Sequence, residues 1–357
     1  MNAPSPEIDI AGRKIGSGHP PYVIAEMSGN HNGDLNRAIS IIEAAKESGA
    51  DAVKLQTYTP DTITIDHNGP GFVVEGGIWH GRSLYDLYRW AQTPWEWHAA
   101  LFARAREIGV TIFSSAFSES AVELLESLQA PAYKIASLEI VDLPLIRRVA
   151  ATGKPVILST GAAALGDIAE AVAVARDAGC GQLALLQCTS GYPTPPTESN
   201  LRTIPHLAAA FGTVVGLSDH TLGVAVPVAA IAFGASLIEK HVTLARADGG
   251  PDADFSLEPN ELARMVQDCR TAWEALGRVT YDLAPSELTA SSLRRSLYAV
   301  ADIAAGEVIN ETNVRSIRPG YGLPPKHLPS ILGKVARHAI PRGRPLRWSD
   351  IDFDAPA

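Results

Sequence analysis

The chain has 357 residues, of which 46% are hydrophobic and 19% are charged, so it is long enough for one large globular domain and a small second one. The formal net charge of −9 argues against nucleic acid or an acidic membrane surface as the main partner. The three cysteines form no paired framework, and neither an apolar leader nor a membrane span is evident, so we expect free thiols and a cytoplasmic location.

Short runs rich in β-branched and apolar residues alternate with amphipathic helical patterns, several of which end at a glycine, as helices commonly do. This alternation predicts a parallel sheet, and eight such units over about 250 residues predict a (β/α)8 TIM barrel. An open doubly wound sheet is the alternative, which the lack of a GxGxxG motif after the first strand disfavours. The predicted strands are 22–27, 52–57, 110–115, 132–137, 155–160, 183–188, 214–219 and 236–242.

A long insertion, residues 60–94, follows the second predicted strand and is rich in glycine and aromatic residues. Loops of that length usually build or cover a functional site, so we expect this one to border a cavity. After residue 280 the alternation of strands and helices stops. The sequence therefore predicts a catalytic barrel over 1–280, a polar linker over 281–296 and a small β-rich domain over 297–357.

The C-terminal part contains an internal repeat. Five of its residues recur at a constant offset: Ile303, Gly306, Ile309, Asn313 and Val314 match Ile340, Gly343, Leu346, Asp350 and Ile351. Such a repeat predicts a duplicated strand–turn–strand unit, although chance similarity is an alternative for so short a match.

Polar side chains end every predicted barrel strand. In a TIM barrel, the carboxyl ends of the strands meet at one face, where active sites are built. The sequence therefore predicts a polar cavity at that face. Its candidate residues are Glu26, Lys54, Gln56, Ser114, Ser115, Lys134, Ser137, Glu139, Ser159, Thr160, Thr189, Ser190, Ser218, Asp219, His220, Glu239, Lys240 and His241.

Two of these residues, His220 and His241, end adjacent strands, which lie less than about 5 Å apart. Their imidazoles can therefore reach one divalent ion, and the positions left open would suit Mn²⁺ or Mg²⁺ acting as a Lewis acid. The alternative is a hydrogen-bonded structural pair.

Lys54 and Lys134 project from the second and fourth strands beside several serines. A buried lysine is costly unless it is paired, so an anionic ligand such as a phosphate or carboxylate is expected. Internal ion pairs to Glu26 or Glu139 are the alternative. Glu26 is also a candidate for proton transfer. The prolines that follow Tyr192 could hold its ring at the cavity mouth.

These residues stand in motifs that resemble the sialic acid synthase family, which joins phosphoenolpyruvate to an acylamino sugar. The motifs "IAEMSGNHNGD", "KLQTY", "YKIAS", "LLQCTSGYPTPP", "GLSDHT" and "IEKH" follow one another in the family's order. The tail, with "RRSLYA" and "RPGYGLPP", resembles the family's antifreeze-like (SAF) domain. The segments "WHGRSLYDLYRWAQTPWEWH" and "ADGGPDADFSLEP" most resemble the pseudaminic acid synthase branch. That branch would use 2,4-diacetamido-2,4,6-trideoxy-L-altrose, and a neuraminate or legionaminate synthase is the alternative.

The resemblance implies a role for each matching residue. His220 and His241 would hold a divalent metal, usually Mn²⁺ with Mg²⁺ or Co²⁺ as alternatives, and Glu239 and Lys240 would support that site. Catalysis would rest on Glu26, Lys54, Lys134 and Glu139. Phosphoenolpyruvate would contact Lys54, Lys134, Ser137, Ser159, Ser190 and Ser218, although neuraminate synthases often carry Asn at the position of Ser190. The sugar would contact Gln56, Tyr192 and Asp252, and Arg318 from the other subunit of a domain-swapped homodimer.

Two functions of other classes remain open at this point. A Schiff-base aldolase would use Lys134 or Lys240 covalently and need no metal. A non-catalytic sugar-binding protein would bind its ligand without releasing phosphate, but it gives the paired histidines and the two lysines no role.

Overall fold

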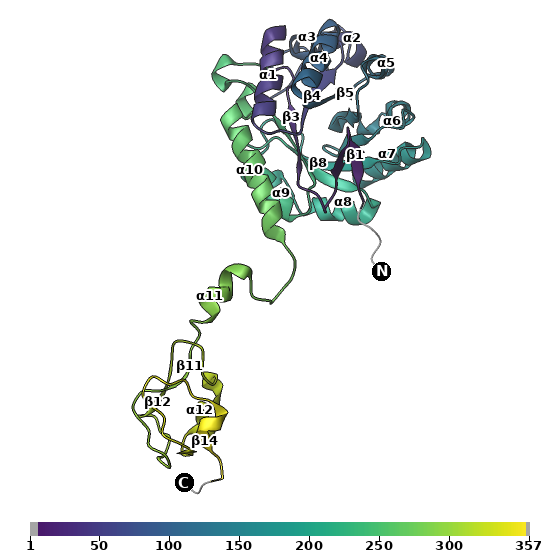
Figure 1. The fold of residues 1–357 in the computed structure, drawn as a ribbon. Coiled ribbons are helices and arrows are strands. Elements are labelled where there is room, and N and C mark those ends of the chain that lie inside the picture. The colour runs from purple at the N-terminus through teal and green to yellow at the C-terminus, as the bar shows by residue number, and fades with distance from the viewer. Residues whose placement is uncertain (1–5, 355–357) are drawn as a thin grey trace. The chain divides into compact units, whose positions relative to one another are not determined.

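The computed structural model describes residues 6–354, and the chain divides into two compact units, Met1–Gly277 and Arg278–Ala357 (Figure 1). In the first unit, parallel strands close into a barrel in which the last strand, β10, pairs with the first, β3. The expected strands and the TIM barrel are confirmed, and the open sheet is excluded. The strands are β3 (Tyr22–Glu26), β4 (Ala52–Thr57), β5 (Thr111–Ala116), β6 (Tyr133–Ile135), β7 (Val156–Ser159), β8 (Leu183–Cys188), β9 (Val214–Asp219) and β10 (Leu237–His241).

Helices surround the barrel and bury one apolar face each (Figure 1). In α1, the buried residues Ala38, Ile41, Ile42 and Ala45 recur at the spacing that puts them on one side of a helix, and Asp34 accepts hydrogen bonds at its N-terminus. The helices are α1 (Leu35–Glu47), α4 (His98–Ile108), α5 (Glu119–Ser127), α6 (Leu143–Ala150), α7 (Leu165–Asp177), α8 (Thr203–Phe211), α9 (Ala225–Ala232) and α10 (Pro259–Leu276).

A short hairpin before the barrel, β1 (Ile8–Ile10) paired with β2 (Arg13–Ile15), was not expected from the sequence. Its three isoleucines are buried in one cluster with Tyr22, Ala52, Val214 and Leu237, which are the first residues of their strands. The hairpin therefore covers the amino-terminal end of the barrel, opposite the face where polar side chains gather.

The insertion after β4 contains two helices, α2 (Pro60–Ile63) and α3 (Leu84–Ala91). Trp79, between them, donates its indole N–H to the carbonyl of Pro251, 2.8 Å away, in the loop after β10. This contact ties the insertion to the carboxyl-terminal face of the barrel, as the length of the segment predicted.

The second unit repeats one pattern of pairing. Strand β11 (Ser296–Ala299) pairs with β12 (Val314–Ile317), and β13 (Val335–Ala336) pairs with β14 (Ile351–Asp352). The pair Ala299–Val314 recurs as Ala336–Ile351, and the offset is 37 in both cases (336 − 299 and 351 − 314).

Hydrogen bonds between the two repeats are reciprocal. The N–H of Gly306 donates to Ala336 and the N–H of Gly343 donates to Ala299, both at 2.8 Å. Both glycines have positive φ, 79° and 85°, a conformation that favours glycine. The sequence repeat is therefore a structural repeat with two-fold pairing. Two short helices, α11 (Leu288–Ser291) and α12 (Leu328–Ile331), belong to the same unit.

Within residues 6–354, none of the helices has the combination of length and apolar sequence that crossing a bilayer requires.

Candidate active site

A buried network of lysines and carboxylates lies at the carboxyl-terminal mouth of the barrel. Lys54 Nζ is 2.7 Å from Glu26 Oε2 and 3.5 Å from Glu239 Oε1, and Lys134 Nζ is 3.7 Å from the same oxygen of Glu239. Ser218 Oγ donates to Glu239 at 3.1 Å. The ion pair between Lys54 and Glu26 was one alternative that the sequence left open, whereas Lys134 pairs with Glu239 instead of Glu139.

The two lysines differ in their electrostatic environment. Burial alone would lower the pKa of Lys54, but Glu239 and Glu26 raise it above its ordinary value. Burial lowers the pKa of Lys134, and the attraction of Glu239 offsets this only in part. Burial would raise the pKa of Glu239, but the two ammonium groups lower it. Glu239 is therefore held as an anion that links both cations.

Several serine hydroxyls lie beside Lys134. Ser137 Oγ accepts a hydrogen bond of 3.1 Å from the N–H of Gly161. A Cβ at Gly161 would lie 2.8 Å from Ser137 Oγ and closer still to Ser190 Oγ, so a larger residue here would displace these hydroxyls. The buried hydroxyls of Ser159 and Ser190 have no hydrogen-bond partner among residues 6–354. Hydroxyls and a lysine in this arrangement suit the oxygens of a phosphate or carboxylate.

The two histidines face each other at the same mouth, with ring centroids 5.3 Å apart. His220 Nδ1 lies 2.9 Å from the carbonyl oxygen of Thr189, which orients the ring and leaves Nε2 free. His241 Nδ1 lies 3.5 Å from Asp252 Oδ2, and Phe255 packs against both rings. Burial lowers the pKa of His220, which favours the neutral imidazole that metal binding requires.

The donors at this position fit a divalent ion with open coordination sites. Among residues 6–354, no cluster of three or more His, Cys, Asp or Glu side chains has a metal-binding arrangement. Apart from its 3.5 Å contact with Asp252, the buried Nδ1 of His241 has no polar partner within that part of the chain. Two imidazoles would leave the remaining positions to water or substrate oxygens.

A cavity of about 200 Å³ opens beside the histidines and has two kinds of wall. Burial raises the pKa of Glu139 to about 7, so this carboxyl group can exchange a proton near neutral pH. The polar wall consists of Ser28, Gln56, Ser137, Glu139, His241 and Asp252. The apolar wall consists of Tyr58, Ile63, Trp79, Leu87, Tyr88, Ala91, Phe117 and Leu138, with Tyr192 completing the rim. Much of the apolar wall comes from the insertion.

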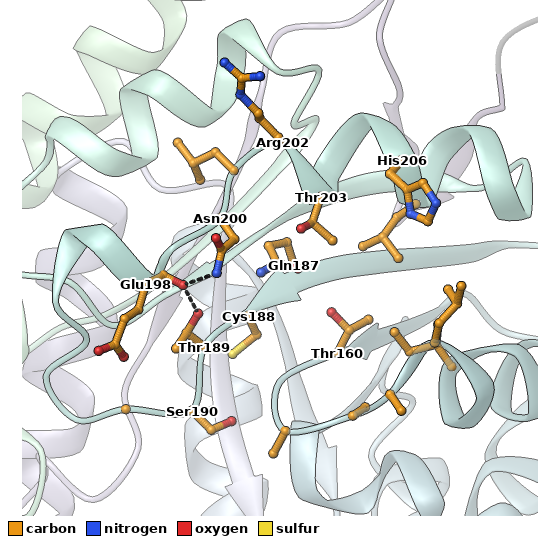
Figure 2. Close-up of a pocket in the computed structure, with 18 of the residues that line it drawn as sticks. Thr160, Gln187, Cys188, Thr189, Ser190, Glu198, Asn200, Arg202, Thr203 and His206 are labelled. Carbon is orange, nitrogen blue, oxygen red and sulfur yellow. Dashed lines mark hydrogen bonds between the residues drawn. The ribbon is translucent and has the colours of Figure 1, made fainter.

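A larger cleft of about 1400 Å³ lies beside the mouth, next to helices α7 and α8 (Figure 2). Its inner end includes Cys188 and Ser190, and its outer end includes Arg202 and His206. The carbonyl of Glu198 accepts hydrogen bonds from the side chains of Asn200 at 2.9 Å and Thr189 at 3.0 Å (Figure 2). Lys54, Lys134 and His220 line neither space, but His241, Glu139 and Asp252 line the smaller cavity, which is therefore the candidate site.

The structure places most of the candidate residues of the first unit at one mouth, whereas Asp219 and Lys240 pair with each other outside the barrel interior. Arg318 belongs to the second unit, where it is exposed directly after β12. The two expected supports for the metal site, Glu239 and Lys240, make their ion pairs with other groups than the histidines. Glu239 contacts the lysines, and Lys240 Nζ bonds to Asp219. Sequence reasoning missed Ser28, whose hydroxyl donates to Asp252 and accepts from Gln56.

Comparisons with known proteins give a consistent picture. Residues 41–281 match the NeuB family and residues 294–352 match the SAF domain. A pseudaminic acid synthase of Helicobacter pylori is 44% identical over 334 residues, which cover 93% of this chain and 98% of that protein. An N,N'-diacetyllegionaminic acid synthase of Legionella pneumophila is 34% identical over 342 residues, covering 94% of this chain and 96% of that protein. The crystal structure of an N-acetylneuraminic acid (sialic acid) synthetase from Leptospira borgpetersenii, in complex with citrate, is 30% identical with a TM-score of 0.72, covering 81% of this chain and 96% of that one.

Proposed function

The chain belongs to the NeuB family, and from that membership we propose that it is a pseudaminic acid synthase. The proposed reaction joins phosphoenolpyruvate, 2,4-diacetamido-2,4,6-trideoxy-L-altrose and water, and it releases pseudaminate and phosphate. The protein would thus be a transferase that forms a carbon–carbon bond. Higher identity to a pseudaminic acid synthase (44%) than to a legionaminic acid synthase (34%) supports this branch.

One observation carries the proposal: two lysines, two imidazoles and unpartnered serine hydroxyls converge on one barrel mouth beside a small cavity. Phosphoenolpyruvate carries a carboxylate and a phosphate close together. Lys54 and Lys134 would bind these anionic groups, with the hydroxyls of Ser137, Ser159, Ser190 and Ser218 as hydrogen-bond donors.

The acylamino sugar would occupy the cavity with two kinds of wall. Gln56, Tyr192 and Asp252 would face its hydroxyl and amide groups. The apolar wall would receive its acetamido methyl groups and the methyl carbon of a 6-deoxy sugar, because these groups have no hydrogen bonds to lose on burial. This match between cavity and substrate favours a deoxy, diacetamido sugar.

The reaction moves protons at three points: the aldehyde oxygen gains one, the attacking water loses one, and the hemiketal hydroxyl gives one to the departing phosphate. C3 of phosphoenolpyruvate attacks the sugar aldehyde, positive charge develops at C2, water adds there, and the resulting hemiketal phosphate releases phosphate by C–O cleavage. We assign Glu139 to donate a proton to the aldehyde oxygen, since its pKa of about 7 keeps the acid available near neutral pH. Glu26, which lies against Lys54 and Gln56, would orient the attacking water and accept its proton.

His220 and His241 would hold a divalent ion, Mn²⁺ by preference and Mg²⁺ or Co²⁺ as alternatives. When bound, such an ion supplies Lewis-acid polarisation of the sugar carbonyl. The proposal also includes a domain-swapped homodimer, in which Arg318 of one subunit reaches the sugar bound by the other. A cytoplasmic location is proposed as well, and the three buried free cysteines suit its reducing conditions.

The deciding experiment measures phosphate release from phosphoenolpyruvate with each candidate acylamino sugar, with and without Mn²⁺. We expect release with the altrose derivative and loss of release with EDTA. Preference for the precursor of legionaminate or neuraminate would reassign the branch. Trapping of a covalent adduct by borohydride, without inhibition by EDTA, would favour the Schiff-base aldolase, and binding without phosphate release would favour a sugar-binding protein.

The paired histidines provide the sharpest test of the metal. His220→Ala and His241→Ala should each abolish phosphate release while the circular dichroism spectrum stays that of the wild type, because both rings lie at the mouth and outside the main apolar core. A wild-type rate in either variant would remove the metal from the proposed mechanism.

A further inference from the structure

A buried ion pair lies directly behind the two histidines and has no place in the proposed chemistry. Lys240 Nζ is 2.5 Å from Asp219 Oδ2, and the two residues are 0% and 3% exposed. They are paired in the register of β9 and β10. Because side chains alternate along a strand, Asp219 and Lys240 face away from the barrel interior, whereas Ser218 and Glu239 face into it.

The ion pair sits where the strand ladder ends. The last paired residues of β9 and β10 are Asp219 and Lys240, so His220 lies one residue beyond the ladder on its own strand. Lys240 Nζ also donates to the carbonyl of Thr221, and Asp219 accepts from the N–H and hydroxyl of Thr221 at 3.2 and 2.9 Å. One ammonium group on the strand that carries His241 therefore holds the residues on both sides of His220.

We propose that Asp219 and Lys240 are positioning residues that set the spacing of the His220 and His241 imidazoles for a shared divalent ion. The inference rests on the proposed function, because it takes the metal as the ligand of these imidazoles. A buried lysine paired with aspartate is costly where an apolar pair could pack, so its presence at this strand end needs a reason. Groups that orient metal ligands act in this way without touching the ion.

The test replaces the charged pair by apolar residues of similar size, Asp219→Leu with Lys240→Met in one chain. Removing both charges together avoids leaving one of them buried and unpaired. Full-length protein is titrated with Mn²⁺ by calorimetry, and the visible absorption of the Co²⁺-loaded protein reports the coordination geometry. We expect a wild-type circular dichroism spectrum, Mn²⁺ affinity weakened about tenfold or more, and an altered Co²⁺ spectrum.

A partly exposed ion pair at a distant position gives the control. Lys154 Nζ is 2.6 Å from Glu126 Oε1, joining α5 to the segment before β7 at the other end of the barrel strands. Glu126→Leu with Lys154→Met should leave Mn²⁺ affinity within about twofold of wild type, because it does not adjoin either histidine. Equal weakening in both double variants would mean general loosening of the barrel and would overturn the proposal.

Two further outcomes are decisive. Unchanged Mn²⁺ affinity and Co²⁺ spectrum in a folded Asp219→Leu/Lys240→Met protein would overturn the positioning role alone. Wild-type protein that binds no Mn²⁺, or binds it equally well after His220→Ala, would overturn the proposed metal site together with this inference. If the double variant does not fold, Lys240→Arg serves instead, because it keeps the charge but changes the donor geometry. We again expect weaker Mn²⁺ binding, and an unchanged Mn²⁺ affinity would refute the positioning role.

Discussion

Glu139 shows how burial changes the pKa of a carboxyl group. It borders the cavity among apolar side chains, and burial raises its pKa from 4.5 to about 7. Between these values the folded protein binds more protons than the unfolded chain, so the free energy of unfolding falls as the pH rises. The stabilisation is complete below about pH 4.5 and is lost as the pH rises through about 7.

Glu139→Gln should remove this pH dependence, because the amide does not ionise. We expect the variant to gain stability relative to the wild type on going from pH 5 to pH 8, by up to about 3 kcal/mol. Thermal unfolding of both proteins at the two pH values measures the difference. A gain that is the same at both values would show that Glu139 ionises normally.

The individual site residues were predictable where strand position alone decides their place. Lys54, Lys134 and His241 lie on strands and His220 directly follows one, and the period of two brings their side chains to the mouth. The partners of these residues were not predictable, because they depend on how the barrel closes. Glu239 contacts Lys54 only because β10 pairs with β3.

Residues on loops were harder still to place from the sequence. The Ser28 hydroxyl donates to Asp252, which lies 224 residues further along the chain. Ser28 also has a positive φ of 47°, which its local sequence does not predict. Such a contact depends on the tertiary fold, so the sequence alone does not predict it.

At the scale of elements, the insertion after β4 supplies much of the apolar lining of the cavity. Ile63, at the end of α2, lines the cavity, whereas Ile65 two residues later is 60% exposed and does not. Ile63→Asn should raise the KM for the acylamino sugar about tenfold, because a polar group would face the methyl groups of the substrate. The KM for phosphoenolpyruvate should stay unchanged, and steady-state kinetics with each substrate varied in turn measures both.

Ile65→Asn is the matched control for this prediction. The same change at an exposed position of the same loop should leave both KM values at the wild-type level. Similar KM increases in the two variants would assign the effect to the loop's conformation rather than to the wall of the cavity.

The hairpin β1–β2 makes a separate contribution, to stability alone. Ile10 is fully buried against the barrel interior, so Ile10→Ala should reduce the free energy of unfolding by about 2–4 kcal/mol. Lys14 is exposed on the same hairpin, and Lys14→Ala should cost no more than about 0.5 kcal/mol. Urea unfolding measures both, and equal effects would mean that the hairpin does not close the barrel.

The sequence did not predict this hairpin, and the reason is physical. Each of its strands has three residues, too few for a period of two to stand out, and its apolar face is defined only by the barrel end that it covers. Most barrel strands are longer, and all of them recur with helices between them, so the sequence pattern identified them.

At the scale of the whole molecule, the proposed exchange of SAF domains makes a test in trans available. Mixing His241→Ala chains with Arg318→Ala chains creates dimers in which one active site combines an intact barrel with an intact Arg318 from the partner. Two inactive proteins should then recover roughly a quarter of wild-type phosphate release after dissociation and reassociation, because half of the dimers are mixed and each has one working site. Each variant reassociated with itself is the control, and no recovery in the mixture would refute the exchange.

The reciprocal pairing inside the C-terminal unit has a consequence for ancestry. The two halves of the unit, residues 296–332 and 333–354, cover each other's apolar side chains, so one half alone could not have been a stable protein. Two separate copies could have covered each other in the same way. The unit would then descend from a gene whose product worked as a pair of identical chains, later fused end to end. In that case a peptide of residues 296–332 should associate with one of residues 333–354. If the two peptides do not associate at millimolar concentration, the unit did not arise by fusion of two identical chains.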